Sequence, residues 1–143
     1  MYRAPASDLS PDPRAEFDDE LTVLLAGRAA EALMLGDVSA GAGGGLDSDL
    51  ALATWLAVQI DTEFGLGASG AACFGAADMH ALSEADRQRA RVRLEKAEHR
   101  AIQLLRSHMP LITKLADRLV NERELKGDEL EEWLAPSLLR PPL

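Results

Sequence analysis

The sequence is poor in the residues that build several common kinds of site and anchor. Cysteine occurs once, at Cys73, which excludes an intrachain disulfide and a cluster of zinc-binding thiolates within one chain. Lysine and arginine are too few for a nucleic-acid surface: 15 of them face 24 acidic residues, a net charge of -9, whereas phosphate binding is driven by cationic side chains. We therefore expect no nucleic-acid partner.

Long apolar runs are also missing. No uninterrupted apolar stretch reaches the length that spans a membrane, because Arg28 and Glu31 interrupt the best candidate. The first residues lack the basic-then-apolar pattern of a signal peptide. We expect a cytoplasmic location and no direct membrane contact from this chain, with any membrane anchor lying outside it.

What the sequence does contain favours helices. Alanine and leucine dominate while aromatic residues make up only 4%, which favours helix-on-helix packing over a sheet. We predict an all-α fold, namely a helical hairpin followed by a long helix and short C-terminal helices. One helical domain is expected over residues 16–135, after a lead-in of residues 1–15 and before a tail of residues 136–143.

The hairpin organises the chain. Helical spacing of apolar residues predicts a first helix over residues 16–35, closed by Gly36. The glycine-rich residues 39–45 lack the lysine of a phosphate-binding loop and indicate a hinge or an exposed loop. A second helix is predicted from Asp47 or Ser48, both good N-cap residues, to Phe64.

The second half of the chain is predicted to consist of helices separated by short breaks. Residues 68–81 are irregular, and a capping-box-like pattern at Ser83 predicts a long helix over residues 83–108. Pro110 suits the first turn of the next helix. A last short helix is expected over residues 129–134, ended by the prolines that follow.

Two charged residues fall on apolar helix faces. Arg28 lies seven residues after Leu21 and so falls on the apolar face of the first helix. A cation there needs a partner, and Glu31, three residues on, is within reach for an ordinary ion pair at the edge of the core. Asp49 shares a stripe with Ala53, and such an inward acid at a helix start is either a capping acid or a ligand. From the residues alone, capping is favoured.

The histidines and the arginines of the long helix give only weak indications of a functional site. The histidines, His80, His99 and His108, are scattered, and no two of them are four residues apart. His99 is expected to contact Glu95 at the surface. The arginines of the long helix alternate with acids and lack aromatics, which favours a solvated face or a subunit contact over a nucleic-acid patch.

Several stretches carry a family resemblance. Residues 24–31, LLAGRAAE, resemble the LLAGRAAEE segment of the FtsH-type ATP-dependent zinc proteases, peptidase family M41. Residues 39–42 with 47–50, SAGA and DSDL, resemble its STGASNDI segment, and residues 62–65, TEFG, resemble its TEYG. Residues 125–130, LKGDEL, match a closing L-x-G-x-E-L turn, and the resemblance covers residues 21 to 134.

The resemblance implies a ring-shaped protease. Such proteins are hexamers in which an ATPase ring unfolds protein substrates and threads them to a zinc peptidase ring. It implies that zinc is held by two histidines of an HExxH helix, whose glutamate is the general base, and by an aspartate that falls on Asp49. Glu31 and Arg28 would be supporting residues. It also implies a cytoplasmic domain, in a parent that can be membrane-anchored.

The sequence departs from the family pattern at decisive points. It has no HExxH and no Walker A motif, and residues 43–46 lengthen the loop before Asp49. We therefore expect the C-terminal part of a longer protease, inactive alone, with zinc only in the complete site and ATP only through a separate ATPase region. The alternative is a non-catalytic helical interaction or oligomerisation domain derived from the family. An open cleft beside Asp49 would favour the first, and a face closed by apolar side chains the second.

Overall fold

Five helices build the part of the chain that the structure describes. A computed structural model describes residues 12–36, 45, 47–66 and 78–138, with side chains as far as Ala135. No strand occurs in these ranges, and the all-α prediction is confirmed. In chain order the helices are α1 (Pro13–Leu35), α2 (Asp49–Thr62), α3 (Glu84–Ser107), α4 (Met109–Glu122) and α5 (Gly127–Leu138).

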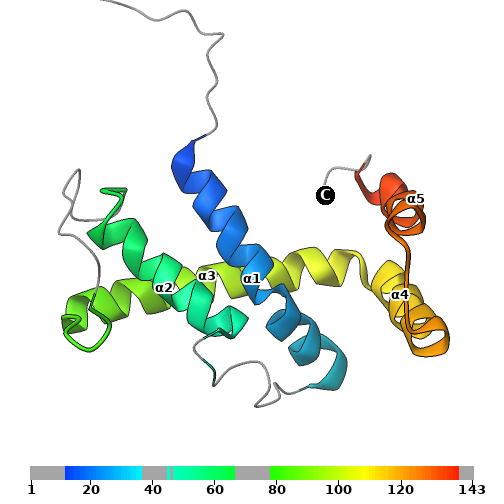
Figure 1. The fold of residues 1–143 in the computed structure, drawn as a ribbon, viewed down its shortest axis with the longest axis horizontal. Coiled ribbons are helices and arrows are strands. Elements are labelled where there is room, and N and C mark those ends of the chain that lie inside the picture. Colours follow the sequence, from blue (N-terminus) through cyan, green and yellow to red (C-terminus); the bar gives the residue numbers. More distant parts are fainter. Residues whose placement is uncertain (1–11, 37–44, 46, 67–77, 139–143) are drawn as a thin grey trace, which may run out of the picture.

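The first three helices form a unit with one core. Both α1 and α2 pack against α3 and against each other, as Figure 1 shows. Large side chains come from α1 and α2, while α3 contributes alanines that let the other two helices approach closely. The core consists of Leu21, Leu25, Ala53, Ala57, Val58, Ile60, Ala90 and Ala97. Burial of each leucine stabilises the unit by about 2 kcal/mol.

Ion pairs join α3 to both of its neighbours. Arg28 of α1 donates through Nε to Glu98 Oε1 at 2.9 Å, and Arg100 Nη1 lies 2.6 Å from Asp19 Oδ1. On the other side, Arg93 Nη2 lies 3.0 Å from Asp61 Oδ1 of α2. The charged residues of α3 therefore fix its position relative to the hairpin.

Helix α1 begins earlier than predicted and ends as predicted. The side chain of Asp12 accepts a hydrogen bond from the Arg14 backbone N–H at 3.0 Å, and Pro13 occupies the first turn, where its missing N–H costs nothing. These residues extend the helix three positions upstream of Glu16. At the other end Gly36 adopts a φ of 74°, the left-handed conformation that closes helices.

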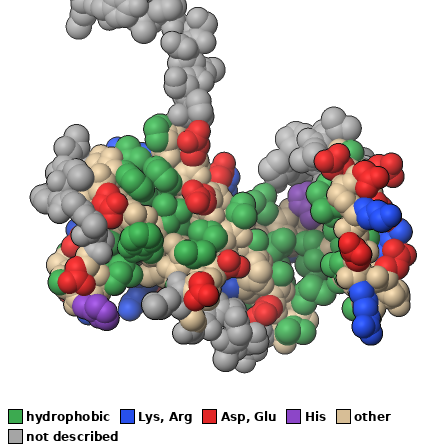
Figure 2. All heavy atoms as spheres, viewed as in Figure 1, with side chains coloured by type: hydrophobic (Ala, Val, Ile, Leu, Met, Phe, Trp, Pro, Cys, Tyr) green, Lys and Arg blue, Asp and Glu red, His purple; other side chains and the backbone are tan. Residues whose placement is uncertain are grey.

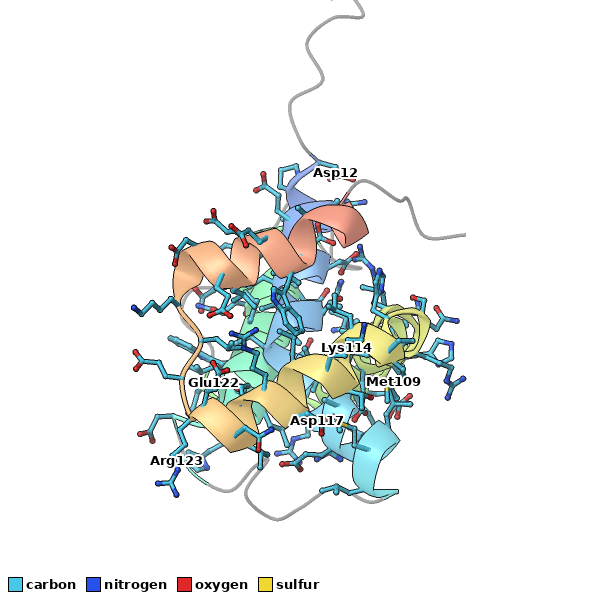
Figure 3. All side chains as sticks on the ribbon, turned by 90° about the vertical axis from the view of Figure 1, so that its right-hand side faces the viewer. Asp12, Met109, Lys114, Asp117, Glu122 and Arg123 are labelled. Atoms are coloured by element: carbon cyan, nitrogen blue, oxygen red, sulfur yellow. The ribbon has the colours of Figure 1, made fainter. Side chains whose placement is uncertain are left out.

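The C-terminal helices extend away from this unit. α4 meets the unit through α3 and has no buried residue. Figure 3 shows α4 running from Met109 through Lys114 and Asp117 to Glu122, with Arg123 at its end. Leu104 of α3 is 37% exposed, because α3 extends past α1 there.

The last helix is longer than the sequence suggested. α5 runs from Gly127 to Leu138, so Pro136 does not end regular structure. Proline removes one intrahelical hydrogen bond, and close to a helix end that loss is small. None of the helices in the described ranges has both the length and the apolar character needed to cross a membrane. The predictions for residues 1–11, most of the glycine segment, Cys73 and the final residues of the tail fall outside the described residues.

Candidate functional site

A cavity of about 360 Å³ lies between α1 and the start of α2. It brings together the three residues singled out in the sequence, Arg28, Glu31 and Asp49. The remaining lining residues are Leu24, Leu25, Gly27, Asp47, Ser48 and Leu50. The cavity therefore has a leucine-lined part and a rim rich in carboxylates.

The start of α2 sets the positions of the two aspartates. Ser48 is the N-cap: its Oγ accepts a hydrogen bond from the Ala51 N–H at 3.2 Å and donates to the Gly45 carbonyl at 2.8 Å. The capping interpretation is therefore wrong for Asp47 and for Asp49. Asp49 is the first residue of the helix, where the helix dipole favours a negative charge.

Asp49 lines the cavity but is exposed, although it follows the same stripe as the buried Ala53. The reason is its place in the first turn, beyond the part of α2 that packs against α1 and α3. Because the carboxylate is not needed for capping, its oxygens are available to a group entering the cavity.

Arg28 makes an ion pair that the sequence did not predict. Its Nε donates to Glu98 of α3, and both side chains are about one-third exposed. The expected neighbour, Glu31, is half-buried and lines the same cavity. Arg28 thus supports the cavity wall by tying α1 to α3.

The described residues do not fit a complete zinc site. No group of three His, Cys, Asp or Glu side chains within the described ranges is placed to hold a metal ion. His80 is exposed, His99 pairs with Gln103 at 3.0 Å rather than with the expected Glu95, and His108 Nδ1 contacts the Leu104 carbonyl oxygen at 2.8 Å. One carboxylate is too few for a zinc ion, which takes four ligands.

Helix α2 contains a buried charge that was not predicted from the sequence. Asp61 of α2 is 3% exposed and lies between Arg93, at 3.0 Å, and Arg89, at 3.8 Å. Its spacing of four residues from the buried Ala57 places it on the buried face of α2, and that signal was available in the sequence. Asp61 is remote from the cavity lining and holds α2 to α3.

Comparison with known proteins identifies the family. The sequence model for peptidase family M41 matches residues 1–133. FtsH 2 of Sphaerobacter thermophilus, an ATP-dependent zinc metalloprotease, is 32% identical over 86% of this chain and 19% of its own length. FtsH 2 of Sorangium cellulosum is 37% identical over 85% of this chain and 23% of its own length.

A third relative gives the same result. FtsH 1 of Symbiobacterium thermophilum is 39% identical over 85% of this chain and 20% of its own length. The chain thus spans about a fifth of the length of the curated relatives it matches. The family model and these similarities show that the chain belongs to peptidase family M41, among the FtsH-type zinc metalloproteases.

Proposed function

We propose that this chain is the C-terminal part of the peptidase region of an FtsH-like, ATP-dependent zinc metallopeptidase. Its contribution is one zinc-ligand carboxylate, Asp49, together with helical contacts for ring assembly. The observation that carries the proposal is the cavity of about 360 Å³. In it Asp49 is exposed beside Arg28 and Glu31, and its carboxylate does not serve as the helix cap. Family membership supports the same reading.

The other components of the protease are supplied by segments outside this chain. The sequence has no HExxH and no Walker A motif, so histidine ligands, general base and ATPase belong to other segments. This chain alone binds no zinc and cleaves no peptide. In the complete protein the substrates are proteins or peptides, the assembly is a hexameric ring, and this domain lies on the cytoplasmic side.

The test joins the chain to the missing ligands. We would fuse it behind the HExxH-bearing peptidase segment of an FtsH-type zinc protease and measure bound zinc per chain by mass spectrometry. We expect about one zinc per fused chain, and an at least tenfold weaker affinity in the Asp49→Asn variant, since a metal ligand is lost. Asp47→Asn, in the same cavity two residues away, is the matched control.

Equal zinc binding by the Asp49→Asn and parent fusions would refute the ligand assignment. Zinc binding by the unfused chain would refute the statement that its site is incomplete. Peptide cleavage by the fusion is a second readout, and it should fall with Asp49→Asn and persist with Asp47→Asn.

A second function is favoured by the absence of a three-ligand metal group among the described residues and by α4, which buries no residue. It is a non-catalytic interaction or oligomerisation domain derived from the family. A fusion that folds but binds no zinc, together with a stable metal-free oligomer of this chain, would support it. The polar rim of the cavity favours the peptidase role.

A further inference from the structure

One stretch of α3 and the start of α5 carry opposite charges. Between Asp86 and Glu95 every charged side chain of α3 is basic: Arg87, Arg89, Arg91 and Arg93. On α5 the stretch from Asp128 to Glu132 contains acidic side chains and one leucine. The start of α3 and α5 lie at opposite ends of the longest axis (Figure 1), so one chain cannot bring them together.

The basic end has a recess. A hollow of about 300 Å³ is lined by Gln88, Arg89, Val92, Arg93 and Lys96, none of which is acidic. Val92 is 37% exposed and supplies an apolar surface within it. The adjoining hollow of about 200 Å³ adds Arg100 on the same helix, with Asp18 and Thr22 of α1.

The positive charge of this recess is only partly balanced. Asp61 is shared by Arg89 and Arg93, and Arg89 also contacts Asp86. The Nε atoms of both arginines are buried without a hydrogen-bond partner. Lys96 lines the same recess and forms no ion pair with a carboxylate of the described residues, so its charge suits the recess to an acidic partner.

The helices at the acidic end expose apolar and acidic side chains. In α4, Leu119 is 46% and Val120 79% exposed, and Figure 2 shows hydrophobic side chains on the side of α4 that faces back toward the three-helix unit. In α5, Glu129 is paired with Arg118, whose guanidinium carbon lies 5.4 Å from the centre of the Trp133 ring. Three further acids of α5 remain exposed: Asp128, Glu131 and Glu132.

We propose that the acidic start of α5 docks in the basic recess of α3 on a second copy of this chain. The contact joins unlike surfaces, so successive copies associate head to tail, an arrangement that forms a ring when the rotation closes. It names the surfaces for the ring contacts in the proposed function. Its chemistry does not involve the cavity beside Asp49.

The test uses charge reversal on the full chain. One double variant, Gln88→Glu with Lys96→Glu, makes the recess acidic and leaves the arginine pairs intact. The other, Glu131→Lys with Glu132→Lys, makes α5 basic. The control, Gln103→Glu with Arg106→Glu, makes the same charge change on exposed positions farther along α3.

Self-association would be measured by sedimentation velocity over a range of chain concentrations and at two salt concentrations. We expect the parent chain and the control to associate, and each double variant to associate at least tenfold more weakly. High salt should weaken the parent contact because exposed charges are screened. An equimolar mixture of the two double variants should associate again, since acidic recess then meets basic α5 and basic recess meets acidic α5.

A parent chain that stays monomeric at every concentration would overturn the proposal, as would equal association of all variants. Failure of the mixture to recover would also overturn it. Binding of a separate acidic peptide to the recess of a monomeric chain would assign the recess to another partner. None of these outcomes alters zinc binding by the fused chain, so the two proposals fail independently.

Discussion

At the scale of single residues, the buried carboxylate of Asp61 is the charge that depends most on its ion-pair partners. It is 3% exposed and serves two guanidinium groups that are themselves one-quarter to one-third exposed. Breaking a buried pair costs more than the pair contributes, because the remaining charges lose their partner. Part of that cost is relieved here by the water that reaches the arginines.

We expect Asp61→Asn to lower the free energy of unfolding by about 2–3 kcal/mol, measured by urea denaturation. Asp19→Asn removes a carboxylate from the exposed pair with Arg100 and should cost no more than about 1 kcal/mol. Similar losses in the two variants would show that the burial of Asp61 contributes nothing extra.

The pH dependence of stability has a local source at the start of α3. The pKa of Asp86 is lowered by hydrogen bonds from the Ser83 hydroxyl, at 2.5 Å, and from Arg89. A carboxyl whose pKa is lower in the folded state stabilises the fold above its ordinary pKa of about 3.9, and this contribution is lost as the pH falls through the folded value.

The difference in unfolding free energy between the parent chain and Asp86→Asn should therefore shrink between about pH 6 and about pH 2. Ser83→Ala removes the largest cause, so in that background the difference should vary less with pH. A difference that grows on acidification would contradict this assignment. Direct titration of the Asp86 carboxyl by NMR should give the same direction.

How far the site could be predicted differs from residue to residue. Arg28, Glu31 and Asp49 were identified from helical spacing and family resemblance, and they do line one cavity. The partner of Arg28 was missed, because Glu98 is 70 positions away and no local pattern links them. Ser48, and neither of the adjacent aspartates, caps α2. The choice depends on backbone angles at the turn, which residue spacing does not specify.

At the scale of elements, the helices differ in what holds them. Every buried side chain in the described ranges belongs to α1, α2 or α3, and the two ends of α3 differ: Ser83 caps one, while His108 links the other to α4. Helix ends marked by Ser83 and Gly36 were predicted well because a cap residue acts locally. The ends near Pro13 and Pro136 were not, because proline is tolerated at helix termini.

We expect a chain ending after His108 to remain folded, with a midpoint of thermal unfolding within about 5 °C of the full chain. The physical reason is that removing α4 and α5 exposes no core side chain. Circular dichroism should show helix loss in proportion to the residues removed. For comparison, Leu21→Ala in the full chain should cost about 2–5 kcal/mol. Collapse of the shortened chain would mean that α4 supports the core.

At the scale of the whole molecule, composition predicted the class of fold but not its outline. Low aromatic content and abundant alanine suit closely approaching helices, and α3 uses alanine in that way. The distance between the basic recess of α3 and the acidic start of α5 could not be read from the net charge of -9, because it depends on how the two helices are placed in space. That placement arises from the length of α3, roughly 36 Å for 24 residues.

The extension of α3 beyond its neighbours also has a mechanical consequence. A pulling force applied at the C-terminal end reaches α5 and α4 first, and the side chains described in these helices, up to Ala135, include none that is buried to resist it. Under load the chain would unravel from that end, one short helix at a time, while the bundle of α1, α2 and α3 still holds. The Asp61 pairs would break last, which makes the three-helix unit the mechanical clamp of the molecule.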